Sequence, residues 1–338
     1  MINEFKSRVE MEIDAEYRSI VACTACGKKL RVPDNRGCLE IKCPSCGYIE
    51  ELEEEEIHLK GGKKLTQDKI RKIIENRVKK LKGYVPRVGV FGVTGVGKSS
   101  LCNALFGADV AKISDVAACT RAPQEIHLSS EGASSGIILI DVPGVGERTD
   151  RDVEYFELYR KLAPTLDLII WVIKADDRAY SISETAYKEI LKPNLEKCPV
   201  LFVINQVDKL PPLRDWNEGK GKPGDKQEES IKKKILEIRD AFGTSEFNIV
   251  PVSVEEKYNL PEIVSRVVDI LPDEKKYSFA REAKEELRSE EVTSKAEQGV
   301  WDSIKKWCGE IWEEHKDTII DGIKTVAISL VSRIFKRK

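Results

Sequence analysis

The sequence of 338 residues lacks the long apolar runs that membrane-spanning helices need, because it holds no uncharged apolar stretch of about 18 residues. The first residues, MINEFKSRVE, have neither a basic start nor an apolar core, so we expect no secretory signal. Neither sign of charge dominates, since the chain has 56 Lys and Arg residues and 58 Asp and Glu residues. A global basic field that would recruit nucleic acid is therefore excluded, and such a contact would need a local patch. These absences favour a cytoplasmic protein.

Four zones follow one another along the chain. Residues 1–56 hold a cysteine cluster and end in a run of acids, and residues 57–84 hold a basic stretch with apolar residues at helical spacing. Residues 85–272 alternate short apolar runs with helical patterns, and residues 273–338 are helical in pattern throughout. The chain is thus predicted to contain a small cysteine domain, a helical linker, an α/β domain and a C-terminal helical region.

Six short apolar runs in the third zone predict strands. Several carry nearly continuous Val, Ile or Leu, as do strands covered by helices on both faces. The runs are Arg87–Gly92, Glu125–Leu128, Ile137–Asp141, Leu168–Ile173, Val200–Asn205 and Asn248–Val252. Their alternation with helical patterns predicts a doubly wound α/β sheet. The Gly- and Lys-rich segment Asp215–Glu229 is predicted to be a mobile surface loop.

Residues 92–99 read GVTGVGKS and match G-x-x-x-x-G-K-[ST] between a predicted strand and a predicted helix. Glycines let such a loop wrap closely, so that backbone N–H groups and the positive end of the next helix face phosphate oxygens. Lys98 is expected to reach the β- and γ-phosphates, and the Ser99 hydroxyl to coordinate Mg²⁺. The other residues predicted to line the phosphates are Thr94, Gly95, Val96, Gly97 and Ser100.

Two further motifs follow predicted strands and indicate a guanine nucleotide. Asp141 begins D-V-P-G, so its carboxylate can hold a Mg²⁺-bound water and the Gly144 N–H can sense the γ-phosphate. Asn205 begins N-Q-V-D, in which the Asp208 carboxylate can accept from both N1–H and the exocyclic amine of guanine. Adenine lacks that donor pair, and an unpaired buried carboxylate would penalise it. The site is therefore predicted to bind GTP or GDP with Mg²⁺.

A third short motif lies at the end of the last predicted strand. The last two residues of the run VPVSV are the small residue Ser253 and Val254. A backbone N–H at this point could meet guanine O6, so both residues are predicted to belong to the nucleotide site.

The runs GVTGVGKSSLCNALFG, DVPGVGE and NQVD resemble those of the Era-like GTPases, the TrmE–Era–EngA–septin class. IKADDRA and ACTR are similar to the bacterial YfjP-type members of that class. The resemblance covers roughly residues 85–272 and implies a P-loop GTPase sheet. It also implies that Thr120, 22 residues beyond Lys98, is the switch I threonine that ligates Mg²⁺. Ser114 and the nearby loop offer other hydroxyls, so a plain loop role is the alternative.

Three positions depart from the patterns of related GTPases. Gln206 replaces the lysine of N-K-x-D and covers the base less fully, so modest affinity with preserved guanine preference is expected. Gly95 stands where K⁺-activated members carry Asn, which puts K⁺ activation in doubt. Val145 stands where Ras-like proteins have a glutamine that orients the attacking water, and a valine side chain cannot form a hydrogen bond to that water. Slow intrinsic hydrolysis is therefore expected.

The missing catalytic group has several candidate sources. A partner protein or a second protomer of a homodimer formed through the nucleotide domain could supply it. The switch residues Glu147, Arg148 and Arg121 are candidates within the chain, although each could also be a solvated loop charge.

Two C-x₂-C pairs stand near the N-terminus, with sixteen residues between them. The four residues Cys23, Cys26, Cys43 and Cys46 have a spacing typical of closed, structural Zn²⁺ sites. An iron–sulfur cluster and a metal-free redox pair are alternatives, and Cys38 is predicted to be a spare thiol. The scattered remaining cysteines favour a reducing compartment over a disulfide framework. We expect this zinc ribbon to recognise a protein or a nucleic acid, although the net charge does not support the latter.

Apolar residues recur at helical spacing from Trp301 to Ile334, and the chain ends on basic residues. A helix that docks on the nucleotide domain or pairs as a coiled coil is the plainer interpretation. Tryptophans and a basic end also suit a membrane surface, while Asp321 and Lys324 argue against insertion across a bilayer.

Two functions remain in view from the sequence. The first is a molecular switch with slow or partner-activated GTP hydrolysis, whose ribbon recognises an unknown protein effector. The alternative is a membrane-associated assembly or mechanochemical GTPase that uses the C-terminal helices. A non-hydrolysing scaffold is disfavoured, because Lys98, Ser99 and Asp141 are all present.

Overall fold

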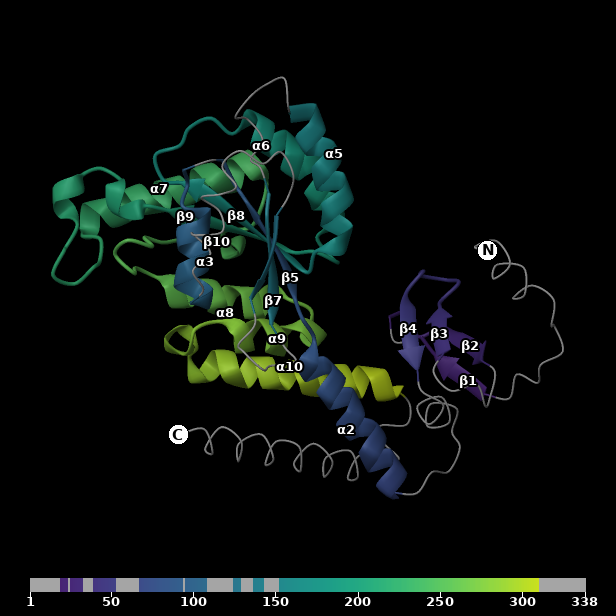
Figure 1. Ribbon diagram of the computed structural model, residues 1–338. Coiled ribbons are helices and arrows are strands. Elements are labelled where there is room, and N and C mark those ends of the chain that lie inside the picture. Colours follow the sequence, from purple (N-terminus) through teal and green to yellow (C-terminus); the bar gives the residue numbers. More distant parts are fainter. Residues whose placement is uncertain are drawn as a thin grey trace. The chain divides into compact units, whose positions relative to one another are not determined.

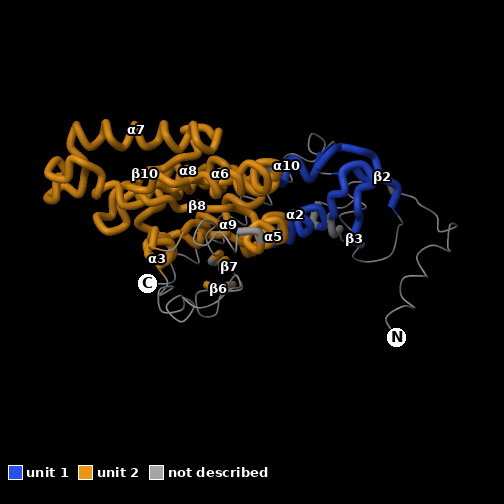
Figure 2. Tube along the Cα trace, turned by 90° about the horizontal axis from the view of Figure 1, so that it is seen from above, with its two compact units in different colours: residues 1–80, 301–338 blue, residues 81–300 orange. Residues whose placement is uncertain are grey.

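The computed structural model describes residues 19–23, 25–32, 39–52, 67–93, 95–107, 124–128, 136–142 and 152–309. The chain divides into two compact units (Figure 2). One unit comprises residues 1–80 and 301–338, and the other comprises residues 81–300.

A six-stranded sheet lies at the centre of the larger unit (Figure 1). Its strands are β5 (Arg87–Phe91), β6 (Gln124–Leu128), β7 (Ile137–Asp141), β8 (Leu168–Lys174), β9 (Val200–Asn205) and β10 (Ile249–Pro251). They lie in the order β10-β9-β8-β5-β7-β6, and β6 runs antiparallel to β7 while the other pairs are parallel. All six predicted strands are confirmed, each to within one residue at either end.

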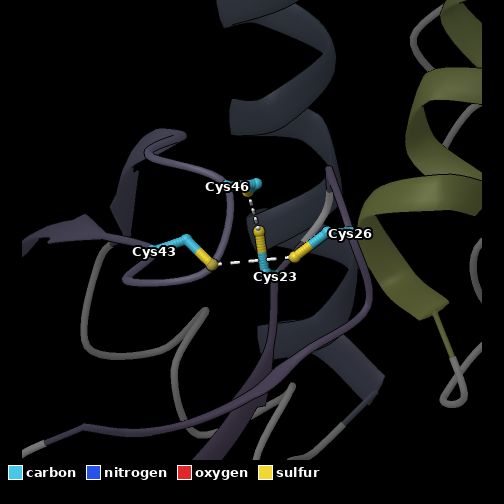
Figure 3. A group of neighbouring side chains, drawn as sticks. All are labelled: Cys23, Cys26, Cys43 and Cys46. Atoms are coloured by element: carbon cyan, nitrogen blue, oxygen red, sulfur yellow. Dashed lines mark hydrogen bonds between the residues drawn. The ribbon is translucent and has the colours of Figure 1, made fainter.

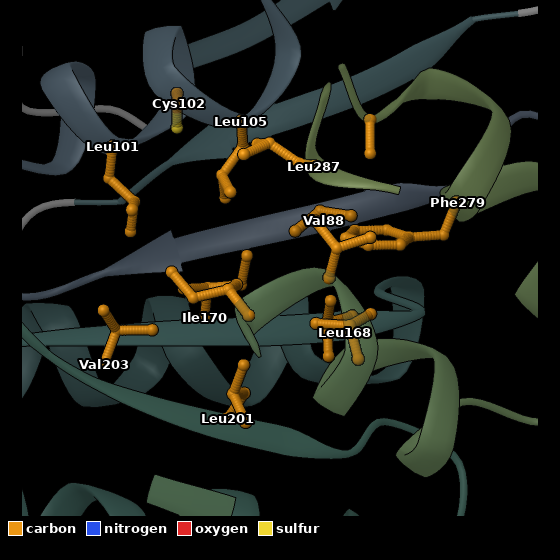
Figure 4. Packing of buried hydrophobic residues seen from close by; sticks show 14 of the residues in the cluster. Val88, Leu101, Cys102, Leu105, Leu168, Ile170, Leu201, Val203, Phe279 and Leu287 are labelled. Atoms are coloured by element: carbon orange, nitrogen blue, oxygen red, sulfur yellow. The ribbon is translucent and has the colours of Figure 1, made fainter. Parts of the chain in front are cut away.

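The strand sequences follow from burial on both faces of the sheet. Every residue from Leu168 to Ile173 of β8 is buried. Leu168, Ile170 and Val172 belong to one apolar cluster, and the alternate residues of the same strand belong to a second cluster. Successive side chains of a strand point to opposite faces, so each face needs apolar residues. Figure 4 shows part of the first cluster, which includes Val88, Ile170 and Leu201 of the sheet together with Leu101 and Leu105.

Helices cover both faces of this sheet. They are α3 (Lys98–Phe106), α5 (Asp152–Leu162), α6 (Ser181–Ala186), α7 (Asp225–Phe242), α8 (Leu260–Ile270), α9 (Asp273–Glu282) and α10 (Glu290–Cys308), the last of which continues into the smaller unit. Residues of α3, α8 and α9 join the first cluster, and residues of α5, α6 and α7 join the second. The doubly wound α/β fold is therefore confirmed.

The hydrophobic core of the larger unit continues past residue 272, where the sequence placed the end of the nucleotide domain. Phe279, Leu287 and Val292 belong to the same apolar cluster as Leu101 of α3. The Lys284 N–H also donates to the Leu105 carbonyl over 2.8 Å. The helices that follow residue 272 thus pack as part of the nucleotide-binding unit.

The prediction of a mobile loop over Asp215–Glu229 is wrong from Asp225 onward. Helix α7 begins at Asp225, and Gln227 in its first turn is completely buried. Residues before it form a short helical turn at Leu213–Asp215 and a bridge between Asn217 and Lys222. The charged residues that suggested a loop form the exposed face of a helix whose apolar side, with Ile231, Ile238 and Phe242, starts only later in the sequence.

The smaller unit contains four short strands and most of a helix. The strands are β1 (Ser19–Ala22), β2 (Lys29–Val32), β3 (Leu39–Lys42) and β4 (Ile49–Leu52), and they form two antiparallel hairpins, β1–β2 and β3–β4. Helix α2 (Gln67–Gly83) confirms the predicted basic helix and buries the apolar stripe of Ile70, Ile73, Ile74 and Val78.

Part of the predicted C-terminal stripe is also described. Ile304, Trp307 and Cys308 at the end of α10 are buried, and the Arg77 guanidinium lies 5.4 Å from the centre of the Trp307 ring. Residues 310–338, with the rest of the stripe, lie outside the described residues. Among the helices that are described, none combines the length and the apolarity that a bilayer crossing demands.

Candidate nucleotide site and cysteine cluster

The loop between β5 and α3 has glycine at three positions with positive φ. Gly92, Gly95 and Gly97 have φ values of 141°, 85° and 92°, a backbone conformation that other residues rarely adopt. A Cβ at Gly92 would lie 2.3 Å from the Val172 carbonyl oxygen, and one at Gly97 would lie 2.4 Å from Nδ2 of Asn205. The loop therefore lies against the ends of β8 and β9, and only glycine fits there.

Lys98 opens α3 and folds back over this loop. Its Nζ donates to the carbonyl oxygens of Gly92, over 2.8 Å, and Val93, over 3.2 Å. The ammonium is thus held beside the loop, and Ser99 and Ser100 occupy the first turn of the helix. A fixed cation and a helix N-terminus at one place attract an anion such as a phosphate chain.

Asn205 joins the phosphate loop to the two segments that were predicted to contact the base. Its Nδ2 donates to the Val96 carbonyl over 2.8 Å. Its Oδ1 accepts from the N–H groups of Gln206, over 2.8 Å, and Val254, over 3.2 Å. The side chain is 2% exposed, so these bonds are shielded from water. The structure therefore brings together three motifs that are far apart in the sequence.

Asp208 lies in a short helical turn, Val207–Lys209, directly after β9. Its Oδ1 is buried and has no hydrogen-bond partner among the described residues. Burying a carboxylate oxygen without a donor is costly, so this atom is suited to a ligand that supplies N–H groups. Guanine presents such donors at N1 and N2. Gln206, before the turn, has a left-handed φ of 64°, and its Oε1 accepts from Lys209 Nζ over 3.4 Å.

The N–H groups predicted to meet guanine O6 donate within the protein. Ser253 N–H donates to the Tyr258 carbonyl over 3.2 Å, and Val254 N–H donates to Asn205 as described above. The Ser253 hydroxyl accepts from Glu256 N–H over 3.2 Å. The structure thus places this segment beside Asn205, while the bond to O6 remains a prediction.

Several predicted residues cannot be placed. Thr94, Thr120 and Gly144 lie outside the described residues, as do Val145 and the three candidate switch charges. Asp141 ends β7, where its backbone pairs with Val90 of β5. Ser99 and Thr120 as Mg²⁺ ligands, and Asp141 as the residue that holds a Mg²⁺-bound water, therefore remain predictions.

One buried residue of this neighbourhood was missed by the sequence analysis. Gln227 Nε2 donates to the carbonyl oxygens of Asp208, over 2.9 Å, and Leu210, over 2.8 Å. No sequence pattern marks Gln227, because it stands among charged residues that are exposed.

The four predicted cysteine ligands come together from two equivalent turns. In the first turn Gly27 N–H donates to the Cys23 carbonyl, and in the second Gly47 N–H donates to the Cys43 carbonyl, both over 2.8 Å. The two glycines have φ values of 72° and 71°, which allow the chain to fold back after each cysteine pair. The turns therefore have the same backbone design, one in each hairpin.

The sulfur atoms have a spacing that fits a tetrahedral metal ion (Figure 3). Cys23 Sγ lies 3.7 Å from Cys46 Sγ, Cys26 Sγ lies 3.6 Å from Cys43 Sγ, and all four lie within 4.8 Å of one another. A tetrahedron with Zn–S bonds of about 2.3 Å has edges of about 3.8 Å. Burial raises the pKa of the Cys43 thiol, but hydrogen bonds from the Cys46 and Ser45 N–H groups outweigh this effect and lower the pKa to about 6, whereas burial raises the pKa of the Cys23 thiol. Thiolates are the form that binds metal.

Comparisons with known proteins agree with the geometry of the nucleotide site. Residues 87–206 match the family model of the 50S ribosome-binding GTPases. YkfA of Escherichia coli is 41% identical over 198 residues, which cover 59% of this chain and 66% of YkfA. YfjP of the same species is 39% identical over 201 residues, which cover 60% of this chain and 67% of YfjP.

Era proteins are more distant relatives. GTPase Era of Aquifex aeolicus is 30% identical over 194 residues, which cover 56% of this chain and 57% of Era. The match to the crystal structure of an Aquifex aeolicus Era variant bound to GDP and AlF₄⁻ covers 56% of this chain and 57% of the Era chain. The TM-score of this match is 0.41 and the sequence identity is 29%. The chain thus spans about two thirds of the length of YkfA and YfjP and less of Era. From its phosphate loop, its sheet and its similarity to YkfA and YfjP, the chain belongs to the Era-like P-loop GTPases.

Proposed function

We propose that this protein is a guanine-nucleotide switch with slow intrinsic GTP hydrolysis, whose N-terminal ribbon binds Zn²⁺ and recognises a partner protein. The observation that carries the guanine assignment is the buried, unpartnered Oδ1 of Asp208. Guanine would supply its missing donors, whereas adenine would leave the oxygen unpaired. Because Asn205 ties the neighbouring backbone to the phosphate loop, base and phosphates would be held by one connected framework.

The phosphate end of the site supports triphosphate binding with Mg²⁺. Lys98 would lie along the β- and γ-phosphates, and Ser99 with Thr120 would hold the metal. When bound, Mg²⁺ neutralises charge on the phosphate oxygens. Val145 offers no hydrogen bond to a water, so turnover by the isolated protein should be slow.

The cysteine cluster supports a structural metal. Four thiolates at tetrahedral spacing leave no open position for chemistry, so the metal would stabilise the ribbon. Among the described residues between 19 and 52, the apolar cluster around Val21 and Val32 is small, too little to hold a domain of this size without metal.

The membrane-associated alternative rests on residues 310–338, which lie outside the described residues. No observation on the described part of α10 favours it, since Val300, Ile304 and Trp307 are buried. The switch is therefore the function that we propose.

Calorimetric titration with GTP, GDP and ATP tests this proposal. The wild-type protein should bind both guanine nucleotides and bind ATP far more weakly. Asp208→Asn should weaken guanine binding and shift preference toward xanthine nucleotides, because their second carbonyl can accept from the new amide. Equal affinity of the wild type for ATP and GTP would contradict the guanine assignment.

A further inference from the structure

Gln227 has a polar side chain and is completely buried. It is not one of the residues that were predicted to contact the nucleotide. It lies in the first turn of α7, and its Nε2 donates to the carbonyl oxygens of Asp208 and Leu210 over 2.9 Å and 2.8 Å. One side-chain amide therefore holds both ends of the segment 208–210. This segment carries the carboxylate on which guanine recognition depends.

The turn around Asp208 has few internal bonds of its own. Lys209 N–H donates to the Gln206 carbonyl over 3.0 Å, and Leu210 N–H donates to the Val207 carbonyl over 3.1 Å. Short helical turns of this kind have poor hydrogen-bond geometry and little intrinsic stability. Without Gln227, the carbonyl groups of Asp208 and Leu210 would lose their buried partner, and the turn could reorient to find water.

Gln227 is itself held in place at the start of α7. Its N–H donates to Oδ2 of Asp215 over 2.9 Å, and the Gly224 N–H donates to the Asp215 carbonyl over 2.9 Å. A carboxylate at the N-terminus of a helix is also favoured by the helix dipole. Trp216, next to Asp215, packs edge-on against Tyr258 with ring centres 5.6 Å apart. The segment before α7 therefore touches the Ser253–Tyr258 turn, while Gln227 in α7 contacts the Asp208 turn.

We propose that Gln227 is a positioning residue for guanine recognition, which sets the Asp208 carboxylate before the nucleotide arrives. Preorganisation of this kind raises affinity because less ordering remains to be done on binding. The segment predicted from sequence as a mobile loop would then be the support of the base site. This inference rests on the proposed guanine specificity of Asp208 and adds a residue that does not contact the ligand.

Gln227→Met tests the role, because methionine has a similar length and shape but no N–H group. We expect GTP and GDP to bind roughly tenfold more weakly and to dissociate faster, with ATP affinity unchanged, so that the GTP/ATP preference falls. Ser230→Ala is the matched control. Ser230 also lies in α7 and donates from its hydroxyl to the same loop, but at the Pro211 carbonyl over 2.7 Å and not at the Asp208 turn. It should leave the preference unchanged.

A purely structural role would behave differently. It would reduce the affinities for GTP and ATP in proportion and leave the GTP/ATP preference unchanged. In an Asp208→Ala background, which has no guanine preference left to lose, adding Gln227→Met should not change the GTP/ATP ratio further. An unchanged ratio in the Gln227→Met single variant, a proportional loss for both nucleotides, or additive effects in the double variant would overturn the inference.

Two further outcomes separate this inference from the proposed function. If Asp208→Asn keeps the wild-type guanine preference, the proposed function fails. If Asp208→Asn loses it while Gln227→Met does not, only the positioning role fails. Should Gln227→Met not fold, Gly224→Ala replaces it, because a Cβ there would lie 2.6 Å from the Asp215 carbonyl oxygen and displace the first turn of α7. The same loss of GTP/ATP preference is expected, and its absence would overturn the role.

Discussion

The side chain of Asn205 donates to the carbonyl oxygen of Val96 over 2.8 Å, which bonds the end of β9 to the phosphate loop 109 residues earlier. The same side chain accepts from Gln206 and Val254. The phosphate half and the base half of the nucleotide site therefore share one buried amide, and changes to this amide should affect both halves.

Asn205→Ala should lower the free energy of unfolding of the nucleotide-free protein by about 2 kcal/mol, because buried backbone groups lose their partner. It should also weaken the binding of GTP and GDP. Thermal unfolding measures the loss of stability, and nucleotide titration measures the loss of affinity. Asn194→Ala is the control, since Asn194 makes a comparable bond to the Ile190 carbonyl over 2.8 Å outside the site. Equal effects of both variants on GTP affinity would contradict the linking role of Asn205.

The glycines of the phosphate loop allow a matched pair of substitutions. Gly97 and Gly95 both have positive φ, but a new Cβ would meet Asn205 only at Gly97 and nothing within 4 Å at Gly95. Gly95→Ala should therefore cost only backbone strain, about 1–2 kcal/mol, while Gly97→Ala should add a clash and abolish measurable GTP binding. Titration of both variants with GTP checks this prediction. Similar affinities of the two variants would show that the clash with Asn205 does not weaken GTP binding.

Hydrolysis by the purified protein should be slow and should rise with protein concentration or with a partner. The reason is that Val145 cannot orient the attacking water, and a partner or a second protomer is one source of the missing group. Phosphate release measured over a series of protein concentrations checks this, with Lys98→Ala as the inactive control. A fast rate that is independent of concentration and unchanged in Val145→Ala would contradict the prediction.

The cysteine domain should carry one Zn²⁺ per chain, as measured by elemental analysis of protein prepared under reducing conditions. Because the metal's binding energy would be most of the domain's folding energy, chelation should unfold residues 20–50. Hydrogen exchange should then become faster in that range alone, and GTP affinity should stay nearly the same. Cys23→Ser should have the effect of the chelator, whereas Cys38→Ser, outside the four-thiol group, should not.

Other outcomes of the metal experiment have clear meanings. Iron, or no metal, would contradict the zinc assignment. Loss of GTP binding on chelation would show that the ribbon is part of the switch and not an independent module.

Much of the fold could be predicted because its signals are local. Continuous Val, Ile and Leu in Leu168–Ile173 and Val200–Asn205 marked buried strands, and β8 and β9 lie there. The spacing of Cys23, Cys26, Cys43 and Cys46 predicted a cluster that the structure brings together. The end of the segment Asp215–Glu229 was misjudged because the charged residues from Asp225 to Glu229 lie on the exposed side of α7 and do not reveal that Gln227 is buried.

The sequence by itself predicted which residues would carry the chemistry: the glycines and Lys98 of the phosphate loop, the carboxylate of Asp208 and the four thiols. Each is recognisable because its function depends on residue type and on spacing within a few positions. The tertiary structure alone decided that Asn205 would join Val96 to Val254, and that Gln227 would hold the Asp208 turn. Those relationships join residues between 19 and 109 positions apart. Buried amides find such partners only where packing brings distant backbone carbonyl and N–H groups together, and no local pattern in the sequence records this.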